Sequence, residues 1–200
     1  MTWLLSVKER VDGMTVRIAG ICGSLRKASY NAGLLRAAAE RAPEGMEVEI
    51  LDISGFPLFN ADLMGDAYPA AVTAVVDRVR ELDGILIASP EYNYGVSGVL
   101  KNAVDWISRP PASSPLFGKP VAFMGASTGY AGTLRAQLAY RQEWHFFRAP
   151  VFSLAEMILP FATTACDESG NPTHPDVLER LDRYLAALAP WFEAQEQAKE

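Results

Sequence analysis

Residues 85–98 have the sequence ILIASPEYNYGVSG, in which a continuous apolar run gives way to a polar, aromatic and glycine-rich segment. A short apolar run of this kind is typical of a parallel β-strand that is buried on both faces. The apolar residues after it recur at helical spacing: Leu100, Ala103, Val104 and Ile107. Pro110 and Pro111 then end the helical pattern. The stretch therefore predicts a buried strand, an irregular loop and a helix in succession.

The same alternation of strand and helix extends in both directions from this stretch. Runs of β-forming residues predict further strands at residues 16–21, 47–51 and 121–125. Apolar residues at helical spacing predict helices at residues 35–42, 72–79 and 134–146. The turn-rich residues 52–65 are predicted to be a loop.

The C-terminal part of the chain completes this pattern. A fifth strand is predicted at residues 150–154, with a weaker β signal at 157–161, and Pro175 opens a last helix that Pro190 is expected to end or kink. Repeated strand–helix alternation predicts an α/β fold with a doubly wound, five-stranded parallel sheet and helices on both faces. A length of 200 residues suits a single domain, predicted over residues 14–200 after an N-terminal extension over 1–13.

Composition excludes several classes of function. A net charge of −6 argues against binding of nucleic acid or of an anionic membrane surface through a general electrostatic field. No apolar run approaches the roughly 20 residues that span a bilayer. The two cysteines lack C-x-x-C spacing and the two histidines lack metal-ligand spacing, so neither a disulfide framework nor a metal site is expected. We expect a cytoplasmic protein with reduced thiols.

In a doubly wound sheet, ligands bind where the carboxyl ends of the strands meet. The loop after the first predicted strand, GSLRKASYN at residues 23–31, brings two serine hydroxyls, an amide and two cations to the start of a helix. Free N–H groups at a helix N-terminus suit a phosphate, and Arg26 can add bidentate hydrogen bonds. The alternative is a surface turn in which Ser29 or Asn31 caps the helix.

Known phosphate motifs narrow the choice of ligand. The chain has neither a G-x-x-x-x-G-K-[ST] nor a G-x-G-x-x-G motif, which excludes a Walker-type nucleotide site and the dinucleotide fingerprint. A phosphatase loop of the form C-x5-R is also absent, since Ala28 occupies the position of the arginine after Cys22. Cys22 is therefore predicted to be a packed residue at a strand end and not a nucleophile.

The loop at residues 89–98 has side chains that suit a flat ligand: Tyr92 and Tyr94 to flank a ring, Asn93 to hydrogen-bond, and Gly95 and Gly98 to allow close approach. The alternative is a structural turn with Ser97 as the cap of the next helix. Trp106 is predicted to lie in the core. The third loop, GASTGYAG at residues 125–132, is a weak signal alone, but its small residues leave room beside a planar ring.

Together the three loops resemble the NADPH-dependent FMN reductase family, a flavodoxin-like group that includes quinone, azo-dye and chromate reductases. The matching segments are residues 23–31, 90–106 and 125–129, with Arg135-Ala-Gln137 and Arg141-Gln142. The chain departs from the family at Thr128, where proline is common, and at Thr133, where a second glycine is common.

The resemblance implies the strand order 2-1-3-4-5 and an FMN site at these loops. The residues implied on the phosphate side are Ser24, Arg26, Ser29, Tyr30 and Asn31. Those implied along the ring and ribityl chain are Pro90, Glu91, Tyr92, Asn93 and Tyr94, with Ser127 and Gly129 approaching from the third loop. It also implies a homodimer or homotetramer, in which Arg135, Tyr140 and Arg141 lie at the subunit interface or on solvated helix faces.

The function expected from the resemblance is a ping-pong NAD(P)H oxidoreductase. NADPH or NADH would reduce FMN, and a small-molecule acceptor (a quinone, an azo compound, chromate or free flavin) would then take two electrons. Because the cofactor carries the chemistry, no catalytic triad or metal is needed. Backbone N–H groups at residues 93–95 are the candidates to stabilise charge on the flavin. The alternative is a flavodoxin-type electron carrier that binds FMN without turning over NAD(P)H.

Overall fold

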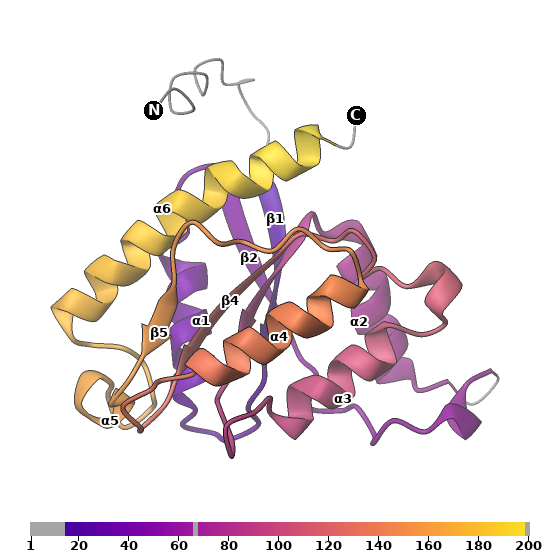
Figure 1. Ribbon diagram of the computed structural model, residues 1–200, viewed down its shortest axis with the longest axis horizontal. Coiled ribbons are helices and arrows are strands. Elements are labelled where there is room, and N and C mark those ends of the chain that lie inside the picture. Colours follow the sequence, from indigo (N-terminus) through magenta and orange to yellow (C-terminus); the bar gives the residue numbers. More distant parts are fainter. Residues whose placement is uncertain (1–14, 66–67, 199–200) are drawn as a thin grey trace.

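A five-stranded parallel sheet forms the centre of the structure, a computed structural model that describes residues 15–65 and 68–198 (Figure 1). Its strands are β1 (Val16–Cys22), β2 (Met46–Leu51), β3 (Gly84–Ala88), β4 (Val121–Ala126) and β5 (Met157–Leu159). Their order is β2-β1-β3-β4-β5, with every neighbouring pair parallel. The predicted fold class and strand order are confirmed. The predicted extension over residues 1–13 lies outside the described residues.

Helices cover both faces of this sheet (Figure 1). They are α1 (Tyr30–Glu40), α2 (Ala70–Glu81), α3 (Gly98–Ile107), α4 (Leu134–Phe146), α5 (Ala162–Ala165) and α6 (Pro175–Gln197). Apolar residues of α1, α5 and α6 pack with one face of the sheet, and those of α2, α3 and α4 form a second cluster on the other. Strands β3 and β4 are buried along their whole length because helices cover them on both sides.

The predicted fifth strand at residues 150–154 is wrong, and the weaker signal at 157–161 marks the real one. Residues 150–152 touch the start of β4 through a single bridge between Val121 and Val151. The apolar character of this segment reflects burial of Phe152, whose ring packs against Tyr184 and Trp191 of α6. A short apolar run therefore signalled core packing here and not a strand.

Helix α6 continues through Pro190 to Gln197, so of the two expectations for this proline, an end or a kink, the end of the helix is wrong. Pro190 is exposed, and the carbonyl that it leaves without an N–H donor belongs to exposed Ala186. The flanking residues Leu188, Ala189 and Phe192 are buried against the sheet. Packing of that apolar face holds the helix together across the proline. No helix in the described part of the chain is both long and apolar enough to cross a bilayer.

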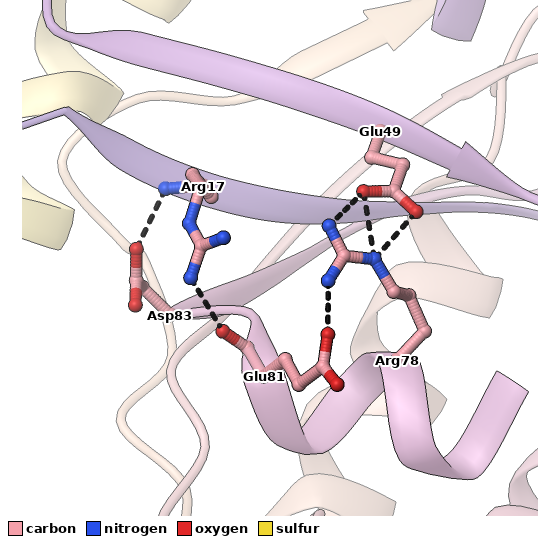
Figure 2. Close-up of polar contacts among 5 residues, drawn as sticks. All are labelled: Arg17, Glu49, Arg78, Glu81 and Asp83. Atoms are coloured by element: carbon pink, nitrogen blue, oxygen red, sulfur yellow. Dashed lines mark hydrogen bonds and ion pairs between the residues drawn. The ribbon is translucent and has the colours of Figure 1, made fainter.

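A polar network ties α2 to the first two strands (Figure 2). Its Arg17 is the second residue of β1, at the opposite end of that strand from the loop at residues 23–31. The backbone N–H of Arg17 donates to Asp83 Oδ2 at 2.7 Å, and its guanidinium donates to the Glu81 carbonyl at 3.0 Å. Arg78 bridges Glu49, at 2.6 Å, and the Glu81 carboxylate, and its guanidinium lowers the pKa of Glu49. These groups are partly exposed, so their role is to fix geometry more than to add stability.

Candidate functional site

Three loops meet at the carboxyl ends of β1, β3 and β4, beside the starts of α1, α3 and α4 (Figure 1). The Gly23 N–H donates to the Ala88 carbonyl at 2.9 Å, which joins the first loop to β3. A Cβ on Gly23 would overlap Ser89 Oγ, and a Cβ on Gly125 would lie 2.5 Å from the Ser89 carbonyl oxygen. Glycine at both positions therefore allows the three loops to pack against one another.

The first loop presents unpaired backbone donors. Among residues 15–65 and 68–198, no acceptor pairs with the N–H groups of Ser24, Leu25 and Lys27. The first amides of α1, at Tyr30 and Asn31, add the donors that a helix N-terminus leaves free. This is the donor set that a phosphate requires.

Arg26 is exposed and folds back over its own loop. Its guanidinium donates to the Ala28 carbonyl and lies 4.7 Å from the centroid of the Tyr30 ring. The Arg26 N–H contacts Ser24 Oγ at 3.4 Å. The guanidinium is thus held beside the free amides while its remaining donors face solvent, from which an anion can approach.

Ser29 and Asn31 are buried, with relative exposures of 2% and 3%. Ser29 Oγ accepts from the Ala32 N–H at 3.3 Å, so Ser29 caps α1. The Asn31 amide bonds both backbone groups of Ala126 at 2.8 Å: Nδ2 donates to the carbonyl and Oδ1 accepts from the N–H. Both side chains are engaged in holding the start of α1, and Asn31 links it to the end of β4.

The second loop contains a tight turn from Tyr92 to Gly95. The two residues exchange backbone hydrogen bonds of 3.2 and 2.9 Å. Asn93 and Tyr94 between them have φ of 51° and 65°, as in a type I′ turn. This conformation is ordinary for asparagine and costly for tyrosine, and strain of this kind concentrates at functional sites. It leaves the Tyr92 and Tyr94 side chains 53% and 71% exposed.

Glu91 does not point freely into this site. Its carboxylate accepts from the N–H groups of Arg135 and Ala136 at 2.8 and 3.1 Å, and pairs with the Arg135 guanidinium at 3.1 Å. It therefore caps α4, whose own N-cap Thr133 makes no side-chain capping bond. The guanidinium of Arg135 lies 3.9 Å from the centroid of the Tyr94 ring. Glu91 and Arg135 together fasten the turn at residues 92–95 to α4.

The third loop is fixed at one end and open at the other. The Ser127 N–H donates to the Leu159 carbonyl at 3.0 Å, and Ser127 Oγ accepts from the Gly129 N–H at 3.1 Å. Gly129 itself is exposed. A Cβ on Gly95, Gly98 or Gly129 would meet no atom closer than 3.7 Å. Unlike Gly23 and Gly125, these three glycines would accept a methyl group without a clash, and Gly98 has no atom within 4 Å of that position.

Both locations expected for Tyr140, a subunit interface or a solvated helix face, are wrong, because only 1% of its surface is exposed. It lies neither on a solvated face nor at a subunit surface. Its hydroxyl is 2.8 Å from Ser89 Oγ and accepts from the Ser97 N–H at 3.2 Å. Arg141 is partly buried and donates to the Phe152 carbonyl at 2.9 Å. No local sequence pattern predicts the Tyr140 contacts, because they join residues 51 and 43 positions apart.

Neither cysteine has the environment of a nucleophile. Burial raises the pKa of the Cys22 thiol, and burial with the neighbouring Asp167 carboxylate raises that of Cys166 to about 11. Within the described ranges, no three His, Cys, Asp or Glu side chains converge to hold a metal ion.

Slow alkylation is the expected consequence for Cys166. A pKa raised from 9.0 to about 11 lowers the thiolate fraction roughly 100-fold at neutral pH. We expect iodoacetamide to modify Cys166 in the folded protein about 100-fold more slowly than in urea, as followed by mass spectrometry. Equal rates in the two states would contradict the burial of this thiol.

Known proteins resemble the chain along most of its length. The family model described as NADPH-dependent FMN reductase matches residues 16–164. An NAD(P)H-dependent FMN reductase of Pseudomonas aeruginosa is 42% identical over 176 residues, which cover 88% of this chain and 95% of that protein. A quinone reductase of Escherichia coli is 36% identical over 181 residues, 89% of this chain and 96% of that protein.

A solved structure agrees with these sequence relatives. The flavoenzyme NAD(P)H:(acceptor) oxidoreductase FerB from Paracoccus denitrificans matches with a TM-score of 0.82 at 30% identity, over 90% of this chain and 99% of that one. The strand order, the loop arrangement and the sequence relatives thus agree, and the chain belongs to the NADPH-dependent FMN reductase family.

Proposed function

We propose that the protein is an FMN-dependent oxidoreductase that takes two electrons from NADPH or NADH and passes them to a small-molecule acceptor by a ping-pong mechanism. The observation that carries the proposal is the set of unpaired N–H groups at Ser24, Leu25 and Lys27, which lies at the same sheet edge as the turn at residues 92–95. The unpaired N–H groups suit a phosphate, and the turn suits a planar ring.

At the phosphate end, the amides of residues 24–27 and the N-terminus of α1 would bind the dianion. Arg26 would exchange its bond with the Ala28 carbonyl for a bidentate pair with phosphate oxygens. Ser24 Oγ lies beside these groups. Ser29, Tyr30 and Asn31 would act by holding Arg26 and the start of α1 in place.

At the ring end, the turn at residues 92–95 and the loop with Ser127 and Gly129 would border the isoalloxazine, with buried Pro90 beneath. Bound FMN supplies the capacity to accept a hydride and release two electrons. The N–H groups of Asn93 and Tyr94 pair with no acceptor in the described ranges, so they are the donors available for charge on the ring. The Gly95 N–H is already engaged with the Tyr92 carbonyl.

The surroundings of this site favour aromatic acceptors. Tyr92, Tyr94, Tyr130 and Phe161 are all more than half exposed, on segments that border the three loops. Exposed aromatic side chains bind planar molecules through ring stacking, which suits quinones and azo compounds better than small anions such as chromate. We therefore place quinone-like molecules first among the acceptors.

We also propose a cytoplasmic homodimer or homotetramer, with neither nucleic acid nor membrane as a partner. Leu134 and Leu138 are one helical turn apart on α4 and are 41% and 58% exposed. With Tyr130 beside them in sequence, they offer an apolar surface next to the turn at residues 92–95. A second subunit placed there would shield the flavin ring from solvent.

The test is an anaerobic absorbance titration of the purified protein with FMN, NADPH and then a quinone. We expect flavin bands that bleach with NADPH and return with the quinone. Arg26→Ala should raise the dissociation constant for FMN roughly tenfold to hundredfold, because a charge-assisted hydrogen bond is lost. Arg183→Ala is the matched control, since Arg183 is a 71% exposed cation on α6.

Three outcomes would count against the proposal. Bound flavin that neither NADPH nor NADH bleaches would favour the flavodoxin-type carrier. Failure to bind FMN would overturn the site. Equal FMN affinity in the Arg26→Ala variant and the wild type would remove Arg26 from the phosphate site.

A further inference from the structure

A buried cluster of hydroxyl groups joins the two ends of the loop between β3 and α3. It consists of Ser89, which follows β3, Ser97, which caps α3, and Tyr140 of α4, with exposures of 2%, 0% and 1%. The Tyr140 hydroxyl is 2.8 Å from Ser89 Oγ and accepts from the Ser97 N–H at 3.2 Å. Ser89 Oγ and Ser97 Oγ are 3.4 Å apart. One phenol oxygen thus binds both ends of the loop that carries the turn at residues 92–95.

The hydroxyl cluster also contacts the first loop. A Cβ on Gly23 would overlap Ser89 Oγ and lie 2.9 Å from Ser97 Oγ, so the backbone of Gly23 rests directly on the cluster. Gly23 opens the segment whose free amides we assign to the phosphate. The hydroxyl cluster therefore lies between the proposed phosphate loop and the proposed ring loop, in contact with both.

Tyr140 is itself held firmly. Its ring stacks on Phe123 of β4 with centroids 5.6 Å apart and planes 9° from parallel. Burial raises the pKa of its hydroxyl, so the group stays protonated at neutral pH and can donate to Ser89 Oγ while accepting from Ser97. The position of the hydroxyl is thus set by β4 and α4 and not by the loop that it binds.

A second contact from α4 reaches the middle of the same loop. Glu91 binds the first amides of α4, and Arg135 stacks on Tyr94. Helix α4 therefore contacts this loop in two ways. The buried Tyr140 hydroxyl binds both ends of the loop, and the start of the helix binds Glu91 and Tyr94 between those ends. Of these contacts, the Tyr140 hydroxyl is the one that a single-atom substitution removes without changing charge or ring packing.

We propose that Tyr140 is a positioning residue for the cofactor site: its hydroxyl fixes both ends of the loop at residues 89–97 and so sets the turn at residues 92–95 relative to the first loop. The proposal rests on the proposed function in so far as the ligand is FMN. Tyr140 does not touch the ligand; it acts through Ser89 and Ser97.

The experiment compares Tyr140→Phe with Tyr184→Phe. Tyr184 is a matched control because it is 2% exposed, donates its hydroxyl to the Phe123 carbonyl at 2.9 Å, and packs in the hydrophobic cluster on the opposite face of the sheet. Each variant loses one buried phenol oxygen. Two readouts are measured: the dissociation constant for FMN, by flavin fluorescence, and amide hydrogen exchange of residues 89–97 in the protein without flavin.

We expect Tyr140→Phe to raise the dissociation constant about tenfold, the scale of one buried hydrogen bond, and to speed exchange at residues 89–97. Tyr184→Phe should change neither, although both variants should lower the melting temperature. Unchanged affinity and exchange in Tyr140→Phe, or equal changes in both variants, would overturn the proposal. If the wild type fails to bind FMN, the proposed function fails, and the exchange comparison still decides whether Tyr140 fixes the loop.

Discussion

Replacement of Gly33 by alanine is expected to lower the free energy of unfolding by about 3 kcal/mol, because a methyl group there would overlap backbone atoms. Gly33 lies in α1 where the turn at residues 167–171 crosses it. A Cβ on Gly33 would overlap the Gly170 carbonyl oxygen and lie 2.5 Å from its carbon. Overpacking costs about 1–3 kcal/mol, and the upper end applies because the backbone, and not a flexible side chain, has to move. In a chain of this length the melting temperature should fall by roughly 10 °C.

Gly98→Ala is the control for this substitution. Gly98 is the first residue of α3, and a Cβ there would meet no atom within 4 Å. Removing the backbone freedom of glycine should leave stability unchanged or raise it by up to about 1 kcal/mol. Urea denaturation of the two variants gives their free energies of unfolding, and so separates the cost of overpacking at Gly33 from the change in backbone entropy that both substitutions cause. A Gly33→Ala variant as stable as the wild type would contradict the close contact of α1 with residue 170.

The effect should extend to the first loop, because the turn at residues 167–171 also supports the cap of α1. Gly170 has a φ of 84°, and a Cβ there would lie 2.8 Å from the backbone of Ser29. Displacing this turn would therefore move the residue at which the proposed phosphate loop enters the helix.

Local pattern was sufficient to predict most of the sheet. Strands β1, β3 and β4 are apolar runs, broken only by Arg17 in β1, and β2 alternates apolar residues with Glu47 and Glu49. The helices between them carry apolar residues at helical spacing. The caps named in the alternative interpretations of two loops, Ser29 or Asn31 for α1 and Ser97 for α3, depend on contacts within three residues, and the structure has Ser29 and Ser97 in these positions. Trp106 has no exposed surface and lies in the core as predicted, with its indole N–H donating to the Pro57 carbonyl at 2.8 Å.

Contacts between residues that are far apart in the sequence could not be predicted from local sequence pattern. Glu91 stands in a loop that suits a ligand, yet its carboxylate caps a helix that begins more than 40 residues later. The same applies to Tyr140, whose spacing suits a helix face but whose hydroxyl bonds the loop at residues 89–97. The prediction of the fifth strand at residues 150–154 was wrong for a different reason. The segment around Phe152 and the strand β5 are both apolar, and periodicity does not distinguish a buried loop from a strand.

Asn31→Ala is expected to lower both the free energy of unfolding, by about 3 kcal/mol, and the affinity for FMN, by about tenfold. The side-chain amide satisfies the N–H and the carbonyl of Ala126, and its removal leaves both groups unpaired at a buried site. Each buried polar group left without a partner costs about 1–3 kcal/mol. The start of α1 would also lose its link to the end of β4, so the amides at residues 24–27 would no longer be held beside the third loop.

Asn102→Ala is the matched control for Asn31→Ala, because Asn102 makes the same two-sided contact with backbone elsewhere in the fold. Its Oδ1 accepts from the Phe59 N–H at 2.7 Å and its Nδ2 donates to the Pro57 carbonyl at 2.9 Å. We expect a smaller loss of stability, since Asn102 is only partly buried, and no change in FMN affinity. Urea denaturation without flavin and fluorescence titration with FMN measure the two effects separately. If Asn31→Ala weakened FMN binding with no loss of stability, Asn31 would be a direct phosphate ligand, because a residue that acts by holding α1 against β4 has to affect the protein without flavin as well.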